Sequence, residues 1–427
     1  MIGKAVLIGF ILTVFPALAG EASALTLEEA LVQAREKLPP YQAVKKKVES
    51  ADALYEASLG PYLPSFDASA ARERHTGDVS DYSATGYDIT LSYRLFDGRR
   101  GASREIAGLD LETQREELRK NLLELDYRVK VAFTTAIAAR EVLQQREIQF
   151  RDAQKDHEVA EGRRSLGAAR LSEVLQASVR LEQARFNIVQ AEGNLRKALS
   201  ELSSLIGGAE GEGAAPNPVG RLETGGAVPD LKLLSDAVLR RPELRQAEIA
   251  LKKTESSRSL VQGEFYPTLS ANLSYSRSDT LTLGNGALED KSAGLTATWN
   301  IFELGKFYRA KSARIETAVS EENLREIKRQ LLLDCRNGYE DYLTAVRNET
   351  VAAEQLRQAE QNYEQAFGEY KVGKGDILSL VQAESLLAVA REQLASARLN
   401  AVLAKALLER IAGIERLDIT KNTGRNP

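Results

Sequence analysis

One stretch decides how this chain is organised: residues 167–177, which read Gly-Ala-Ala-Arg-Leu-Ser-Glu-Val-Leu-Gln-Ala. A similar stretch returns 206 residues further on, where residues 373–383 read Gly-Lys-Gly-Asp-Ile-Leu-Ser-Leu-Val-Gln-Ala. Each leads into an alanine-rich run that ends at another glycine, Gly207 or Gly413. Self-similarity at a fixed spacing is the signature of a repeated structural unit. We therefore expect one architecture with an internal two-fold repeat.

The same spacing relates positions outside these stretches. Residues 93–97, Tyr-Arg-Leu-Phe-Asp, correspond to residues 299–303, Trp-Asn-Ile-Phe-Glu. Between the repeats, residues 207–229 are rich in Gly, Ala and Pro, which is typical of a linker. The predicted plan is a first repeat over 25–206, a second over 230–413, and a polar tail over 414–427.

Residues 1–24 have the pattern of a secretory signal peptide. Lys4 supplies a positive start, and Ala5 to Val14 form a short apolar run. Ala22-Ser23-Ala24 is a small-residue cleavage site, and Ala17-Leu18-Ala19 is the competing one. The run ends at Pro16 and is shorter than the roughly 20 residues of a spanning helix. No later stretch reaches roughly 18 apolar residues, so any membrane crossing is expected to use strands.

Composition excludes several classes of protein. The 57 Lys and Arg against 61 Asp and Glu give a net charge of −4, which offers no basic field for nucleic acid. A single cysteine, Cys335, cannot build a disulfide framework. The two histidines, His75 and His157, fall in different predicted elements, so no cluster has metal-ligand spacing. Without a catalytic triad, phosphate loop or dinucleotide motif, we expect neither a cofactor nor enzymatic activity.

Long helices are predicted on both sides of each glycine turn. Residues 102–161 and 306–370 contain no proline, and a helix of about 90 Å is rare in a single domain. The helices that follow, over 168–205 and 376–412, carry alanines at heptad spacing, which indicates a coiled coil or bundle: Ala177, Ala184, Ala191 and Ala198, then Ala383, Ala390, Ala397 and Ala404. Shorter helices are expected over 26–59 with a break at Pro39-Pro40, 230–240 and 242–262.

Each half also contains one predicted strand pair, 65–75 with 82–96 and 268–281 with 291–302. Apolar residues alternate with polar ones, as Leu269, Ala271, Leu273 and Tyr275 do with Ser270, Asn272, Ser274 and Ser276. Four strands are too few to close a barrel, and an open sheet leaves unpaired edges. Three copies would close a twelve-stranded transmembrane β-barrel with its apolar faces toward lipid. The alternative is a soluble sheet with those faces packed on a helix; the signal and the helix lengths favour the barrel.

With these features in place, the mature chain resembles the TolC-type outer membrane factors of Gram-negative efflux and secretion systems. The resemblance rests on the opening Thr-Leu-Glu-Glu-Ala-Leu at 26–31, the aromatic-acidic corners at 95–98 and 301–303, and the two glycine signatures. It implies a homotrimer, mainly helical with a small β part. A long α-helical coiled-coil barrel would cross the periplasm, and a β-barrel would lie in outer-membrane lipid.

The same resemblance implies the function. The expected role is the exit duct of a tripartite efflux system, in which a periplasmic adaptor links the duct to an inner-membrane pump that supplies the energy. Two alternatives stay open: an exit duct for type I protein secretion, and a soluble periplasmic coiled-coil adaptor.

Family positions can be carried onto individual residues at the helix turns. Gly167 and Gly373, each preceded by an apolar residue, Leu166 or Val372, match the turns that the adaptor contacts. Glycine admits a positive φ and the close approach of a partner backbone.

Two further sets of positions concern the gate and the pore. Tyr370, with Glu173 and the adjacent Ser172, matches a link between coils that holds the closed state. Ser379 and Gln382 stand where some members place aspartates that ring the pore constriction; both are uncharged, so no acidic ring is expected at these positions. Asp376, one turn away, is the remaining acidic candidate.

Overall fold

A computed structural model describes residues 24–77, 82–208, 216–222, 230–280, 287–414 and 417. Nearly all of the predicted signal peptide and polar tail, and most of the predicted linker, lie outside these residues. The chain divides into two compact units, Met1–Ala34 with Val129–Leu222 and Arg35–Arg128 with Glu223–Pro427. Among the helices described, none is both long and apolar enough to cross a bilayer.

The first unit is built on a helical hairpin. Its elements are β1 (Ala24–Leu25), the start of α1 (Leu27–Lys37), the later part of α3 (Arg100–Ser165), α4 (Leu171–Leu205) and β4 (Asn217–Pro218). The predicted alanine heptad of α4 is confirmed as a buried seam: Ala177, Ala184, Ala191 and Ala198. Alanine at these positions permits close packing of two helix backbones. Ala160 of α3 packs there against Val174 and Ala177 of α4.

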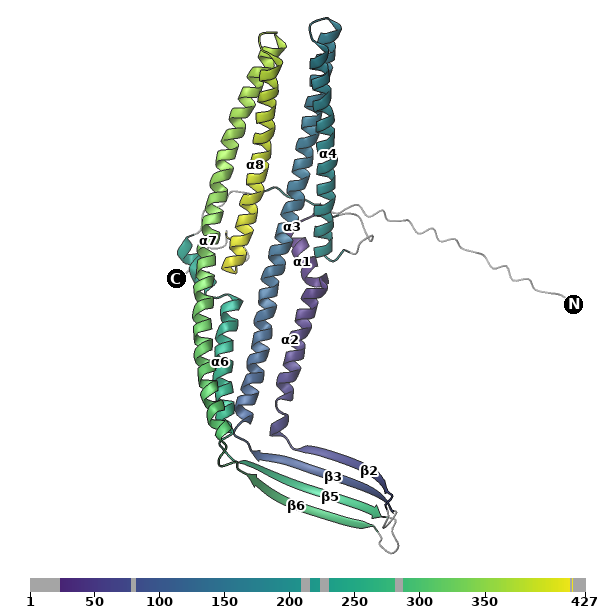
Figure 1. Ribbon diagram of the computed structural model, residues 1–427, viewed down its shortest axis with the longest axis vertical. Helices are drawn as coiled ribbons and strands as arrows, with labels where there is room; N and C mark the ends of the chain where they lie inside the picture. The colour runs from purple at the N-terminus through teal and green to yellow at the C-terminus, as the bar shows by residue number, and fades with distance from the viewer. Residues whose placement is uncertain are drawn as a thin grey trace, which may run out of the picture. The chain divides into compact units, whose positions relative to one another are not determined.

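The second unit holds the remaining helices. They are α2 (Pro39–Ala57), η1 (Gly60–Tyr62), α5 (Leu231–Val238), α6 (Pro242–Gly263), α7 (Leu304–Lys371) and α8 (Ile377–Ala412), together with the start of α3. At 1.5 Å per residue, the 68 residues of α7 span about 100 Å. Both α6 and α8 run along α7 (Figure 1).

The core of this unit lies where α5 meets α7 and α8. Leu234, Tyr342 and Leu408 are almost fully buried in it, and so is Cys335. Burial raises the pKa of the Cys335 thiol above its ordinary value. In α8 the predicted alanine seam is mixed with leucine, and Ala397 and Ala404 are only half-buried. The buried positions on this helix are Leu380, Ala383, Leu387, Ala390, Leu394, Ala401, Ala406, Leu408, Glu409, Ile411 and Ala412.

The predicted break between the first two helices is present. α1 ends at Lys37 and α2 begins at Pro39, with Leu38 extended between them. Proline suits the first position of a helix because the amide hydrogen that it lacks has no partner there in any case. The residue before proline is driven out of helical conformation, which separates the two helices.

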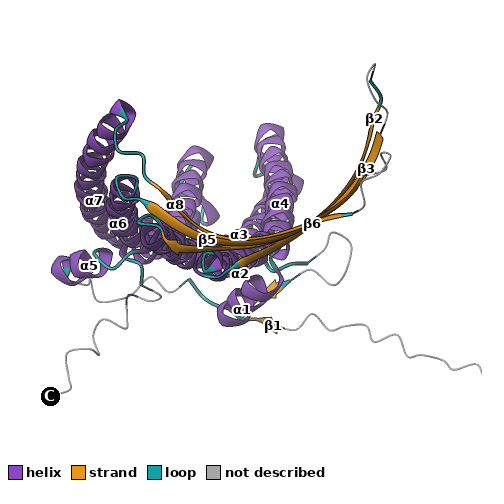
Figure 2. Cartoon of the chain, turned by 90° about the horizontal axis from the view of Figure 1, so that it is seen from below, coloured by secondary structure: helices purple, strands orange, loops and turns teal. Residues whose placement is uncertain are grey.

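The four remaining strands form one antiparallel sheet in the order β2-β3-β5-β6, shown edge-on and curved in Figure 2. Their bounds are β2 (Ser65–His75), β3 (Tyr82–Phe96), β5 (Thr268–Thr280) and β6 (Leu288–Thr298). The register places Phe66, Leu91, Leu273 and Ala293 in one row across the sheet. Helices attach at one end of every strand, and the free end of the sheet is where β2 and β5 end and β3 and β6 begin (Figure 1).

The register sorts the side chains into two faces of opposite character. Because successive residues of a strand point to opposite faces, the face on which one row of paired residues lies determines the face of every other row. The apolar face carries Phe66, Ala68, Ala70, Tyr87, Ile89, Leu91, Tyr93, Leu269, Ala271, Leu273, Tyr275, Ala293, Leu295 and Ala297 and, toward the end remote from the helices, the charged residues Arg72, Arg74, Arg277, Asp279, Glu289 and Lys291. The polar face carries Ser65, Asp67, Ser69, Asp88, Thr90, Ser92, Ser270, Asn272, Ser274, Ser276, Ser292, Thr296 and Thr298.

The last strand differs from its predicted range of 291–302. It begins three residues earlier, at Leu288, and ends at Thr298. Its partner β5 begins at Thr268, directly after Pro267, which has no amide hydrogen to extend the ladder. Beyond the final pair Thr268–Thr298, the indole of Trp299 donates to the Phe265 carbonyl at 3.0 Å instead.

Candidate functional site

The turn after α3 combines an exposed apolar residue with a left-handed glycine. Leu166 is 84% exposed and Gly167 has φ +69°. The Gly167 amide donates to the Arg164 carbonyl at 2.9 Å, and the Ala168 amide donates to the Arg163 carbonyl at 2.8 Å. These two bonds are a Schellman cap, which satisfies the last carbonyls of the helix and requires a residue that tolerates positive φ.

The turn after α7 repeats this geometry. Val372 is 68% exposed and Gly373 has φ +78°. The Gly373 amide donates to the Tyr370 carbonyl at 3.1 Å, and the Lys374 amide donates to the Glu369 carbonyl at 2.9 Å. A Cβ atom added at Gly167 or Gly373 would meet nothing within 4 Å. Each turn therefore presents bare backbone beside one exposed apolar side chain, which a partner backbone can approach closely.

The internal repeat extends to the far ends of the following helices. Gly207 after α4 has φ +79° and Gly413 after α8 has φ +68°. Within the described ranges, positive φ at glycine occurs at these two positions and at the two turns, and the two pairs have the same spacing of 206 residues. The duplication seen in the sequence thus recurs in backbone conformation.

The two turns lead into their next helices in different ways. The Arg170 amide at the start of α4 donates to the Glu173 carboxylate at 3.3 Å. At the start of α8, the Asp376 carboxylate accepts from the Ser379 amide at 2.7 Å. The side-chain and backbone hydrogen bonds from Ser379 lower the pKa of Asp376. Asp376 therefore caps α8 as an anion, and this structural role accounts for its charge.

The predicted gate and pore residues differ in exposure. Tyr370 is buried, at 6% exposed, Glu173 is half-buried, and Ser172 is exposed. Because Tyr370 and Glu173 belong to different units, their link stays a prediction. Asp376, Ser379 and Gln382 all lie exposed at the beginning of α8, and their place at a pore constriction also stays a prediction.

The corner after β3 is a charged anchor. Asp97 is 5% exposed and accepts from Arg94 Nη1, the Arg99 amide and Arg99 Nε, each at 3.0 Å. Burial alone would raise the pKa of Asp97, but the hydrogen bonds from Arg99, with the charges of both arginines, bring it below its usual value. The adjoining Gly98 packs on Gly263 of α6, where an added Cβ would lie 2.8 Å from the Gly98 backbone.

The corresponding corner after β6 uses a different set of charges. Glu303 and Glu264 both accept from the Arg309 guanidinium, at 3.2 and 2.8 Å. Lys306 is 6% exposed and donates to the carbonyls of Glu264 at 2.7 Å and Asn300 at 3.0 Å. Sequence reasoning missed Lys306, although a lysine in the first turn of a helix is itself a signal. Positive charge is unfavourable there and indicates a dedicated partner.

Replacing Asp97 by alanine should destabilise the junction between sheet and helices by about 2 kcal/mol near neutral pH, since its arginine partners are half exposed. The pKa of Asp97 is lowered in the folded chain, so its contribution is present above its unfolded pKa of about 4. It is lost as pH falls through the folded value. Thermal unfolding in detergent should therefore separate wild type from Asp97→Ala at pH 7 and much less at pH 3. An equal loss from the exposed Asp67→Ala would contradict the anchor.

In the part of the chain that the structure describes, no group of three His, Cys, Asp or Glu residues could hold a metal ion. The candidate site therefore consists of the two helix turns and the two-faced sheet.

A comparison with protein families decides which kind of protein carries this arrangement. The family model described as outer membrane efflux protein matches residues 30–208 and 233–414, one match to each half. The chain belongs to the outer membrane efflux protein family. The predicted resemblance is confirmed: members of this family are outer-membrane channels with a helical periplasmic part, and not enzymes. Membership implies a trimeric channel of tripartite systems.

Individual relatives within the family are distant. The chain is 27% identical to protein CyaE of Bordetella pertussis over 86% of its length and 80% of the relative. It is 23% identical to the outer membrane protein TolC of Escherichia coli over 92% of its length and 83% of the relative. Among solved structures, a crystal structure of CusC matches with a TM-score of 0.78 at 18% identity, covering 91% of this chain and 92% of that one. This match confirms the mainly helical fold with one four-stranded sheet.

Proposed function

We propose that three copies of this chain form the passive exit duct of a tripartite efflux system, from the periplasm to the cell exterior. The observation that carries the proposal is the two-faced sheet with open edges. Within the described strands, β2 and β6 are the outer strands and have no further partner. An open antiparallel sheet with a continuous apolar face is unstable in isolation as a membrane element, because its edge amides and carbonyls need partners.

Closure by three copies supplies those partners. β2 runs away from the helices and β6 runs back toward them, so β6 of one copy meets β2 of the next in antiparallel orientation. Twelve strands then close with no edge left, and the alternation directs the apolar face to lipid and the polar face to water. The rows of mainly apolar residues from Leu269 to Tyr275 extend about 20 Å along the strand, and charged residues begin one row further, at Arg277.

The helical part supplies the periplasmic duct and its docking turns. We take the two repeats, 25–206 and 230–413, as the structural units that each contribute one helical hairpin. A periplasmic adaptor would seat on Leu166-Gly167 and Val372-Gly373, where backbone and one apolar side chain are exposed side by side. An inner-membrane pump would supply the energy, since the chain belongs to a family of channels.

A second candidate keeps the duct and changes its cargo to a secreted protein. The family match supports efflux and protein secretion equally, and no side chain of the two turns favours one function over the other. A strain that carries this chain with an efflux pump, or with a protein exporter, would distinguish them by which cargo leaves the cell. The sequence also left open that the chain is a soluble periplasmic coiled-coil adaptor. This alternative is no longer supported, because both halves match the channel family.

Purified full-length chain should migrate as a trimer in detergent and conduct ions in planar bilayers. The double variant Tyr370→Phe, Glu173→Gln should raise single-channel conductance severalfold, because it removes the hydroxyl and the carboxylate of the proposed gate link. Ser259→Ala, an exposed position on α6 outside both the gate link and the pore candidates, serves as the control. A monomer without conductance would contradict the duct, whereas equal conductance of variant and wild-type channels would contradict the gate link alone.

A further inference from the structure

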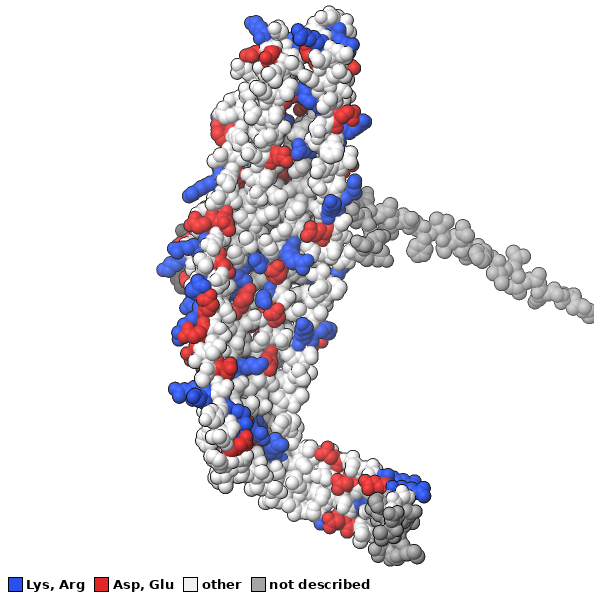
Figure 3. Space-filling model, viewed as in Figure 1, with Lys and Arg blue, Asp and Glu red and all other residues white. Residues whose placement is uncertain are grey.

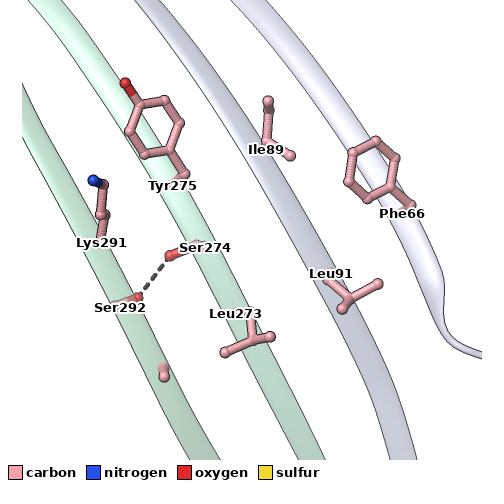
Figure 4. A pocket seen from close by; sticks show the side chains of 9 residues that line it. Phe66, Ile89, Leu91, Leu273, Ser274, Tyr275, Lys291 and Ser292 are labelled. Carbon is pink, nitrogen blue, oxygen red and sulfur yellow. Dashed lines mark hydrogen bonds between the residues drawn. The ribbon is translucent and has the colours of Figure 1, made fainter.

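A hollow of about 390 Å³ lies on the apolar face of the sheet (Figure 4). It is lined by Phe66, Ile89, Leu91, Leu273, Tyr275 and Ala293, with Lys291 at its margin. The register explains the depression, because short side chains interrupt rows of long ones. Ala293 follows Leu273 in one row, and Ala68 precedes Ile89 in the next.

Lys291 lies on the side of the hollow toward the free end of the sheet. It is opposite Tyr275 on the neighbouring strand, and its Nζ lies 5.8 Å from the centre of the tyrosine ring. One end of the hollow therefore carries a positive charge, and the rest is lined mainly by apolar side chains, with Ser274 and Ser292 also in the lining.

Further basic residues continue from Lys291 toward the free end. On the face drawn in Figure 3, Asp and Glu lie along the sheet, and Lys and Arg lie near its tip. One row beyond Lys291 is Arg277, and one row beyond that is Arg72. Rows on one face are about 7 Å apart along the strands. The basic residues of the sheet on the apolar face are Arg72, Arg74, Arg277 and Lys291.

Acidic residues are fewer on the apolar face of the sheet than on the polar face. The apolar face carries two, Asp279 and Glu289, and both pair with Arg277, at 3.5 and 3.4 Å. The polar face carries four: Asp67, Glu73, Asp88 and Asp290. Within the described residues, Arg72, Arg74 and Lys291 form no ion pair, so the apolar face keeps an excess of positive charge at this end.

We propose that this hollow binds a membrane lipid with an anionic phosphate headgroup, its acyl chain lying across the hollow and its phosphate held by Lys291, while Arg72, two rows nearer the free end on β2, adds to the positive field. The proposal rests on the proposed function, which turns the apolar face to the bilayer. Two observations favour this lipid. The surface combines apolar side chains with basic residues at one end, and these basic residues lie at the end remote from the periplasmic helices. A phosphate at that level contacts basic side chains while its acyl chains cover the apolar rows.

The test uses purified full-length trimer and native mass spectrometry, which counts bound lipids. Phosphatidic acid and phosphatidylcholine with identical acyl chains are titrated separately, and inorganic phosphate is added as competitor. Wild type should bind phosphatidic acid about tenfold more tightly than phosphatidylcholine. The double variant Lys291→Gln, Arg72→Gln should lose that preference. Ala293→Trp, which fills the hollow, should weaken both lipids equally, and Lys328→Gln, an exposed lysine of α7, should change neither.

Three results would overturn the lipid site: equal binding of the two lipids to wild type, unchanged preference in the double variant, or displacement of phosphatidic acid by millimolar inorganic phosphate. The last would mean a plain anion site without an acyl chain. Trimer mass and bilayer conductance are recorded on the same preparations. A conducting trimer without lipid preference overturns this site and leaves the duct intact, whereas a chain that stays monomeric overturns both.

Discussion

Leu273→Arg should abolish assembly into the outer membrane. Leu273 lies mid-strand on the apolar face, between Leu91 and Ala293, and is half exposed in one copy. An arginine facing lipid near the bilayer centre costs about 2–4 kcal/mol, and the trimer carries it three times, for a total of about 6–12 kcal/mol. We expect the variant to disappear from the outer-membrane fraction of cells that express it.

The neighbouring residue provides a matched control. Asn272 precedes Leu273 on β5 and points to the polar face between Ser92 and Gly294. Asn272→Arg adds the same charge and bulk to a water-filled lumen, so it should assemble normally and only narrow the pore. Normal assembly of both variants, or loss of both, would contradict the assignment of the two faces.

Gly373→Trp should raise susceptibility to an exported compound to that of cells lacking the chain. A Cβ at Gly373 has open space around it, so the side chain fits and the folded chain bears only the strain of positive φ, about 1–2 kcal/mol. The bulky indole would, however, occupy the surface on which the adaptor is proposed to seat. Growth inhibition in the presence of the compound measures the loss, and trimer yield shows that assembly continues.

Gly373→Ala separates strain from bulk at the same position. It imposes the same backbone cost with a single methyl group, and should retain most of the transport. Gly167→Trp tests the corresponding turn of the first repeat and should behave like Gly373→Trp, because the two turns share the same cap and exposure. Full transport by both tryptophan variants would remove the docking assignment.

Local signals allowed much of this fold to be predicted from the sequence. β2 and β3 begin and end at the residues where alternation and turn composition place them. The glycine turns were visible because a Schellman cap needs positive φ, which favours glycine at a fixed place after each helix. The heptad alanines of α4 were visible because close helix packing selects small residues at that period.

What could not be predicted depends on neighbours distant in the sequence. β6 ends at Thr298 because β5 begins at Thr268, so alternation continuing to Ile301 was misleading. The burial of Asp97 and Lys306 depends on the approach of α6 to the sheet, and neither residue carries a motif for it. The hollow beside Lys291 needs the register of all four strands, which no single strand specifies.

The most direct test measures whether each face of β5 contacts lipid or water. Single cysteines at Leu273 and Asn272 would carry a nitroxide spin label in vesicles. Wild type is the blank, because Cys335 is fully buried and burial raises the pKa of its thiol. Relaxation by lipid-soluble oxygen and by a water-soluble nickel complex is then compared. If β5 turns its apolar face to lipid and its polar face to water, oxygen dominates at position 273 and nickel at position 272. A label at 273 shielded from both would mean that the apolar face is packed against protein, and would contradict the lipid-facing barrel.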